Sequence, residues 1–176
     1  MIENLTSHFV EIITSGKVLN IELFNINDSY LELESRDLWG IDGGIQFTFP
    51  KGIIQIGWCP KTEMFLLSQD DIKKNEAEYE YKELRKGKIT KIHNLIGKKV
   101  INSDFKWLQF DFWDNDADNF IAKNMLVGLV LEFDSEDIIQ IVLADYALDE
   151  QEEPVNISYD LTAEILITLG ERMSVE

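Results

Sequence analysis

Residues whose side chains could do chemistry are concentrated in one stretch, WLQFDFWDNDADNF, at residues 107–120. Two tryptophans and three phenylalanines stand there among four aspartates. This composition is compatible with three kinds of site: a calcium-binding loop, a pair of catalytic carboxylates, or an acidic, aromatic surface for a partner protein. The spacing of the residues favours the third.

The first possibility is a calcium loop of the helix-loop-helix type. Asp114, Asp116 and Asp118 fall at the first, third and fifth positions of such a loop, where oxygen ligands are required. However, Asn119 occupies the sixth position, which needs glycine, and Met125 occupies the twelfth, which needs a bidentate glutamate. The aromatic run before the aspartates also has the character of a strand rather than a helix. The sequence therefore predicts no metal site, and no other cofactor.

We expect millimolar calcium or magnesium to leave the melting temperature unchanged, because the missing glutamate removes two ligand oxygens and much of the charge of the site. The measurement is thermal unfolding with and without each ion. A clear upward shift with calcium would contradict this interpretation of Asp114, Asp116 and Asp118.

The second possibility is catalysis by paired carboxylates. Two carboxylates act as acid and base only at a fixed separation around a cleft, and spacing along the sequence does not establish one. The chain has two histidines and one cysteine, so a Ser-His-Asp or Cys-His site would require distant residues to meet in the fold. Neither a phosphate-loop pattern nor a strand-linked GxGxxG occurs. The sequence predicts that the protein is not an enzyme.

The third possibility is a binding surface. Odd and even positions of a strand face opposite ways, so the aromatic residues before the aspartates cannot all share one face. The odd face carries Phe105, Trp107, Gln109, Asp111 and Trp113, and the even face carries Lys106, Leu108, Phe110, Phe112 and Asp114. An exposed tryptophan beside carboxylates has the makeup of a protein-binding hot spot. The alternative is that both faces are buried between layers and the acids are merely solvated. The candidate partner-binding residues are Asp111, Trp113, Asp114, Asp116 and Asp118, with Asp149, Glu150, Glu152 and Glu153 of the expected loop DEQEEP as a second patch.

The distribution of charge supports a cationic partner. The net charge is −17, which repels nucleic acid and anionic membranes and attracts basic proteins. Residues 111–176 hold 17 acids and 2 bases, whereas residues 51–110 hold 8 acids and 12 bases. Nearly all the excess is therefore C-terminal. A solvated acidic surface without a specific partner is the alternative reading of the same counts.

The elements that must position these residues are mostly strands. Alternating apolar residues at 45–49 and 54–58, on either side of a Pro-Lys-Gly turn, predict a hairpin. A second hairpin is predicted from the alternation at 19–23 and 31–33. MLVGLVLEF and IIQIVLADY, joined by DSED, predict a third. Its strands, near 125–133 and 138–146, are apolar on both faces and belong in the centre of a sheet.

Helical signals are few. Apolar residues at three- and four-residue spacing predict an amphipathic helix over residues 1–14. Ser68 and Asp71 resemble a capping box that would open a polar helix through about Leu84. We therefore expect a mainly β (α+β) fold: an antiparallel sheet, sandwich or half-barrel, with an N-terminal helix and one more short helix.

Size and composition fit one soluble domain over residues 1–176. A chain that is 45% hydrophobic can bury an ordinary core, and its longest apolar runs fall well short of the roughly 20 residues that cross a bilayer. The N-terminus lacks a basic segment followed by an apolar one, and Cys59 is the only cysteine. We expect a cytoplasmic protein.

Tryptophan-bearing and apolar strands such as LWGIDGGIQFTF and VLEFDSEDIIQIVL, in a small, strongly acidic chain, resemble those of bacterial immunity proteins. These proteins neutralise polymorphic or contact-dependent growth-inhibition toxins. The resemblance implies tight binding of a cognate toxin domain, often a basic nuclease, inside the producing cell. Acidic residues placed over the toxin's nucleic-acid site would block it.

Two other functions stay open. A DNA mimic would inhibit many nucleic-acid-binding proteins, with carboxylates spread like phosphates over one long face and with broad, salt-sensitive binding. A carboxylate-based hydrolase would have a deep polar cleft in which two carboxylates face each other.

Overall fold

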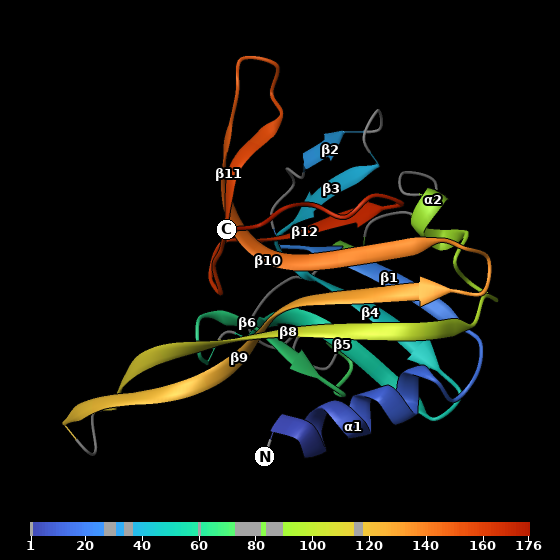
Figure 1. The fold of residues 1–176 in the computed structure, drawn as a ribbon, viewed down its shortest axis with the longest axis horizontal. Coiled ribbons are helices and arrows are strands. Elements are labelled where there is room, and N and C mark those ends of the chain that lie inside the picture. Colours follow the sequence, from blue (N-terminus) through green and yellow to red (C-terminus); the bar gives the residue numbers. More distant parts are fainter. Residues whose placement is uncertain are drawn as a thin grey trace.

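The computed structural model describes residues 2–26, 31–33, 37–59, 61–72, 82–83, 90–114 and 118–176. The chain forms two antiparallel sheets, an N-terminal helix α1 (Ile2–Ile13) and a short helix α2 (Thr90–His93) (Figure 1). The expected mainly β class, with its N-terminal helix and one more short helix, is confirmed. Among the described residues, no helix has the length and apolar character needed to span a bilayer.

Each sheet combines a run of consecutive strands with strands from other parts of the chain. The first has the order β6-β5-β4-β1-β7 and comprises β1 (Asn20–Asn25), β4 (Gly44–Phe49), β5 (Gly52–Cys59), β6 (Met64–Ser68) and β7 (Lys82–Glu83). The second has the order β2-β3-β12-β10-β9-β8, with β11 also on β10. It comprises β2 (Leu31–Leu33), β3 (Leu38–Ile41), β8 (Val100–Asp114), β9 (Asn119–Phe133), β10 (Ile138–Leu148), β11 (Pro154–Tyr159) and β12 (Glu164–Leu169).

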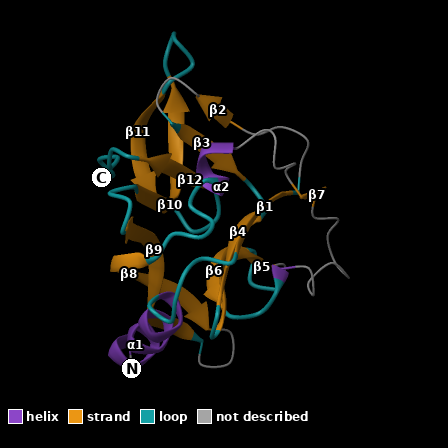
Figure 2. Cartoon of the chain, turned by 90° about the vertical axis from the view of Figure 1, so that its right-hand side faces the viewer, coloured by secondary structure: helices purple, strands orange, loops and turns teal. Residues whose placement is uncertain are grey.

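The main core takes side chains from both sheets and from α1. The helix contributes Phe9, Ile12 and Ile13, and it packs against β5 and β8 (Figure 2). The apolar residues of the helix, which recur every three or four positions, therefore form the face that closes one side of the core. The largest side chains buried in this core include Ile21, Leu23, Phe47, Ile54, Phe65 and Phe133.

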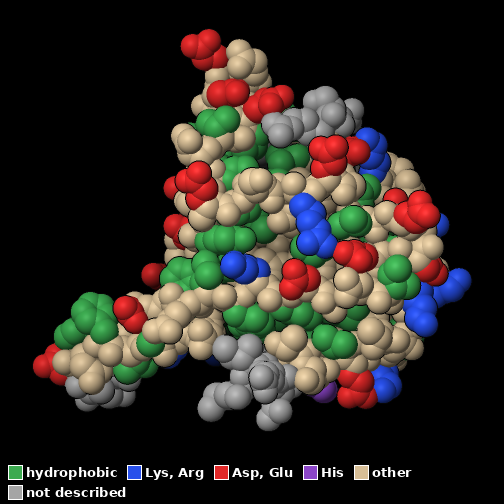
Figure 3. All heavy atoms as spheres, in the orientation of Figure 1, with side chains coloured by type: hydrophobic (Ala, Val, Ile, Leu, Met, Phe, Trp, Pro, Cys, Tyr) green, Lys and Arg blue, Asp and Glu red, His purple; other side chains and the backbone are tan. Residues whose placement is uncertain are grey.

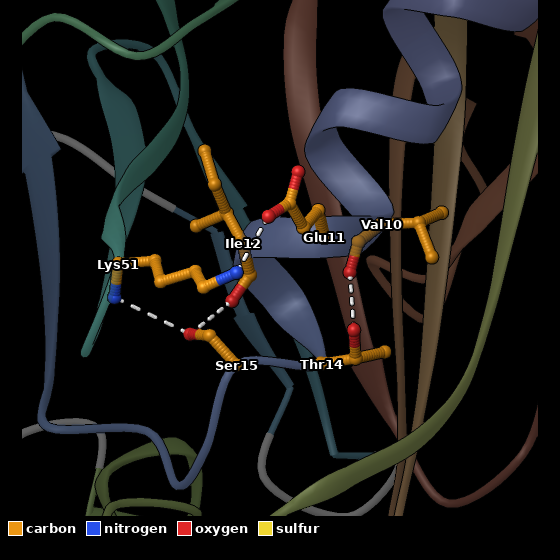
Figure 4. Close-up of polar contacts among 6 residues, drawn as sticks. All are labelled: Val10, Glu11, Ile12, Thr14, Ser15 and Lys51. Atoms are coloured by element: carbon orange, nitrogen blue, oxygen red, sulfur yellow. Dashed lines mark hydrogen bonds and ion pairs between the residues drawn. The ribbon is translucent and has the colours of Figure 1, made fainter.

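The end of α1 is tied to the turn between β4 and β5. Lys51 Nζ lies 2.5 Å from Glu11 Oε1, and the Lys51 N–H donates to Ser15 Oγ at 3.3 Å (Figure 4). The Thr14 hydroxyl donates at 2.8 Å to the Val10 carbonyl, which also accepts the Thr14 N–H at 2.9 Å. The hydrogen bond and charge of Lys51 hold the pKa of Glu11 below its usual value.

Two of the three predicted hairpins are confirmed. β4 and β5 pair across the Pro-Lys turn, with Phe49 opposite Gly52. β9 and β10 pair with Ile138 opposite Glu132, and both are inner strands of their sheet. Residues 126–131 of β9 and 139–144 of β10 are buried in succession, so both faces are covered as the apolar runs indicated.

The hairpin predicted from residues 19–23 and 31–33 is wrong. β1 pairs with β4, Ile21 lying opposite Phe47, and with β7, whereas β2 pairs with β3 in the other sheet. Alternation shows that a segment has one apolar face, but any strand with a matching face can be its partner. Here the choice was made by strands that come later in the chain.

The helix predicted from Ser68 through about Leu84 is also wrong where the structure describes it. Ser68 ends β6, and its Oγ accepts the Asp70 N–H at 2.9 Å in a local turn. Lys82 and Glu83 form β7 beside β1, and residues 73–81 lie outside the described part of the chain. Ser68 therefore stabilises the turn that follows a strand rather than the start of a helix, and serine is common in both places.

The face of β4 that carries Gln46 is buried rather than exposed to solvent. Gln46 is 2% exposed, and its Oε1 accepts the Ile72 N–H at 3.0 Å. Its Nε2 donates to Glu22 Oε2 at 3.2 Å. One glutamine thus satisfies the backbone of the segment that follows β6 and links that segment to β1.

We expect Gln46→Leu to destabilise the protein by about 1–3 kcal/mol, because it leaves the buried Ile72 N–H without an acceptor. Denaturant unfolding measures this loss. Gln109→Leu is the matched control, since Gln109 is exposed on β8 and its replacement should stay within about 0.5 kcal/mol. Equal losses in the two variants would contradict the role assigned to Gln46.

Candidate protein-binding surface

β8 and β9 continue well beyond the rest of their sheet. β10 pairs with β9 only as far as Val142 opposite Gly128, whereas β8 and β9 stay paired as far as Asp114 opposite Asn119. Residues 107–114 and 119–127 therefore form a two-stranded ribbon whose far end projects from the body (Figure 1), whereas Leu126 and Val127 at its base are buried in the main core. We call these residues the aromatic ribbon. The prediction that the aromatic run is a strand is confirmed.

Register fixes which residues of the aromatic ribbon share a face. Trp113 lies opposite Phe120, and Asp111 lies opposite Ala122. Directly opposed residues of an antiparallel pair point to the same side, so all four occupy one face. The other face carries Leu108, Phe110, Phe112, Ile121, Lys123 and Met125. The predicted odd and even faces therefore hold along β8, and Phe105 and Trp107 at the base of the odd face pack against the main core.

Trp113 and Phe120 form an exposed aromatic pair. Their ring centroids lie 5.1 Å apart in an edge-to-face arrangement at 77°. Trp113 is 51% exposed and Phe120 is 67% exposed. Within the described residues, they are two of five large apolar side chains with this degree of exposure. The choice left open by the sequence is thus decided: the far part of the odd face is in water.

The opposite face of the aromatic ribbon is more shielded. The rings of Phe110 and Phe112 lie 6.5 Å apart, and Lys123 Nζ stands 5.5 Å from the centre of the Phe112 ring. Leu108, Phe110 and Phe112 are half-buried and pack against the main core. A cation over an aromatic ring covers apolar surface while its charge stays hydrated, so this face is less available to a partner than the Trp113 face.

The predicted aspartates at positions 111–118 lie in different places. Asp111 is exposed on the same face as Trp113. Asp118 is exposed in the turn that leads into β9, with a left-handed backbone (φ 50°) that aspartate tolerates better than most residues. Asp114 ends β8, but its side chain lies outside the described residues, as does all of Asp116. The part of the chain that is described holds no cluster of residues suited to a metal.

The second predicted patch lies in the turn between β10 and β11, but its members differ. Asp149 is half-buried, and its Oδ1 accepts the N–H groups of Gln151 at 2.8 Å and Glu153 at 2.9 Å. Its carboxylate therefore holds the turn in shape. Glu150 and Glu152 are exposed and project from that turn, whereas Glu153 is half-buried. The exposed negative charge of this patch comes mainly from Glu150 and Glu152.

Two exposed apolar residues were missed by the sequence argument. Phe120 joins Trp113 only through the register of the ribbon, which the sequence does not reveal. Leu148, at the end of β10, is 52% exposed and stands directly before the acidic turn. The sequence signal that could have identified Leu148 is its position directly before DEQEEP. An apolar residue beside an exposed acidic loop is a candidate for exposure.

Two tyrosines, Tyr146 of β10 and Tyr159 of β11, lie in the part of the second sheet where these two strands pair. The Tyr146 hydroxyl donates to Glu164 Oε2 at 2.7 Å. Burial is the main cause that raises the pKa of Tyr146, followed by the hydrogen bond to Glu164 and the charges of Glu164 and Asp145. Burial also raises the pKa of Tyr159, with a smaller contribution from the charge of Asp104. Both hydroxyls are therefore held neutral in the folded state.

A raised tyrosine pKa stabilises the folded state below the unfolded value of about 10, and that stability is lost as the pH rises above it. We expect the melting temperature to fall as the pH rises above about 10, and Tyr146→Phe to reduce that fall. Thermal unfolding of both proteins across this range is the measurement. An identical fall in the variant would show that Tyr146 does not contribute.

The fold and this surface together define a class of protein: an acidic, two-sheet antiparallel β protein whose longest hairpin presents an exposed aromatic pair. No protein-family model, curated protein or solved structure significantly matches the chain.

Proposed function

We propose that this protein is a cytoplasmic immunity protein that binds a basic bacterial toxin domain, a nuclease being the favoured kind, and neutralises it by protein–protein contact. The observation that carries the proposal is the exposed Trp113–Phe120 pair on a projecting ribbon of a protein whose net charge is −17. Tryptophan is among the residues most enriched at the energetic centres of protein interfaces.

The charge around the pair fits a basic partner. The segment 107–127 holds four aspartates and one lysine, which leaves a local charge of −3. Carboxylates at the rim of an interface accelerate encounter with a cation, while the aromatic side chains supply the surface that is removed from water. A nuclease surface that binds phosphates is a suitable cationic target, and a bound acidic ribbon would exclude its substrate.

Each alternative function lacks part of this support. A DNA mimic needs carboxylates spaced along a smooth face, whereas here exposed aromatic rings stand between them. A carboxylate-based hydrolase needs two facing carboxylates in a cleft. The cavity of about 450 Å³ beside β3 and β12 is lined by Asp37 and Glu171, but Asp37 is ion-paired with Lys91.

Co-expression tests the proposal directly. The proposal predicts that a large secreted protein is encoded beside this gene, and the probe is the C-terminal domain of that protein, expressed with and without this protein in a growth assay. We expect growth arrest to be relieved, and the purified domain to bind this protein but not several unrelated DNA-binding proteins. Binding to all of those proteins would favour a DNA mimic. Arrest that persists without any binding would overturn the proposal.

A further inference from the structure

The second sheet divides into two ribbons. Beyond Val142, β9 no longer pairs with β10, and from Ala144 onward β11 is paired with β10 instead. At Ala144 the other edge of β10 is already occupied by Glu164 of β12, so β11 takes the side that β9 has left. One ribbon is therefore the aromatic ribbon. The other consists of residues 145–158, and we call it the acidic ribbon.

The two ribbons leave the same end of the sheet and diverge (Figure 1). Where they part there is a cavity of about 230 Å³, whose lining includes Asp104, Gly128, Val142 and Tyr159. Gly128 keeps this junction tight, since a Cβ there would lie 3.3 Å from Lys106 Cβ. The junction therefore has little room for a larger residue at position 128, and one ribbon, or arm, lies on each side of it.

Exposed apolar side chains are concentrated on these arms. Of the five large ones among the described residues, Trp113 and Phe120 lie on the aromatic ribbon and Leu148 on the acidic ribbon. The other two, Leu19 and Ile101, lie elsewhere on the surface. Each arm therefore carries an apolar anchor of its own beside exposed carboxylates.

Negative charge lines the margin between the arms. Figure 3 shows acidic side chains from the end of the acidic ribbon down to the aromatic ribbon. Exposed residues in this region include Asp104 at the junction and Asp145, Glu150 and Glu152 on the acidic ribbon. Two basic residues also line the junction: Arg172, which is paired with Glu132 at 2.7 Å, and the exposed Lys106.

We infer that the two ribbons form a cradle that holds one folded basic protein domain and contacts it with both arms at once. The inference rests on the proposed function and adds the shape of the partner and a second contact. The eight residues of β8 in the aromatic ribbon extend about 25 Å, which is roughly three quarters of the diameter of about 34 Å of a domain of about 100 residues. A second copy of this chain is a poor occupant, because it would bring its own charge of −17 to an acidic surface.

The test uses the toxin domain that the co-expression experiment identifies and one variant for each arm. Trp113→Ser removes the anchor of the aromatic ribbon, and Leu148→Ser removes that of the acidic ribbon. Leu19→Ser is the matched control, since Leu19 is 57% exposed and lies on neither arm. We expect each arm variant to raise the dissociation rate at least about fivefold, and the control to leave it unchanged. Circular dichroism and melting temperature first establish that every variant is folded.

Hydrogen exchange and light scattering complete the experiment. We expect amides of both ribbons to become protected in the complex, which should contain one copy of each protein. If wild type binds but only the aromatic ribbon responds, the cradle is wrong and the proposed function stands. A complex with two copies of this chain would also overturn the cradle. If the wild-type protein does not bind the toxin domain at all, the proposed function fails, and the cradle with it.

Discussion

Replacing Trp113 by alanine should weaken binding of the toxin domain by about 2 kcal/mol or more, which is about 30-fold in affinity. The loss should fall on the dissociation rate, because an apolar anchor acts after the two surfaces have met. Trp113 is 51% exposed in the free protein and supported on one side by Phe120, so a partner can cover the rest of its ring. Surface-bound kinetics measures both rates.

The neighbouring aspartates provide the control for this prediction. Asp111→Asn and Asp118→Asn should mainly slow association, because their carboxylates are exposed and act over a distance. That effect should shrink as salt shortens the Debye length from roughly 10 Å at 0.1 M to roughly 3 Å at 1 M. If association is insensitive both to salt and to these changes, the aspartates are merely solvated and the electrostatic part of the proposal is wrong.

Phe47→Ala should destabilise the fold by about 3–5 kcal/mol, the largest loss of stability that we expect from one substitution. Phe47 is 2% exposed at the middle of β4, between Ile21 of β1 and Ile54 of β5, and its ring stacks 6.4 Å from that of Phe49. Its removal leaves a cavity where two strands and the facing sheet meet. The melting temperature should fall by roughly 2–4 °C for each kcal/mol.

Phe120→Ala is the matched control for Phe47→Ala, because the same side chain is removed from a position that is 67% exposed. We expect its free energy of unfolding to change by less than about 1 kcal/mol. Chemical denaturation of the two variants gives the comparison. A loss at Phe120 as large as that at Phe47 would show that the aromatic ribbon is part of the cooperative core rather than a projecting arm.

Local sequence patterns were sufficient to predict much of the fold. The turns after Phe49 and Phe133 are short and follow apolar runs, so the β4–β5 and β9–β10 hairpins are encoded by adjacent residues. The N-terminal helix likewise depends only on the spacing of its own apolar residues. The pairing of β1 with β4 and β7 was not predictable in this way, because several strands offer β1 an equivalent apolar face.

The candidate surface also combines features that the sequence predicts with features that it does not. The sequence by itself determined the acidity of the C-terminal part, the strand character of the aromatic run and the separation of its odd and even faces, because composition and the two-residue period of a strand are local properties. Only the tertiary structure decided that Trp113 lies in water, that Phe120 stands opposite it, and that β11 displaces β9 beside β10 to make two arms. These features depend on where neighbouring strands stop pairing, and that endpoint is set by contacts between residues far apart in the chain.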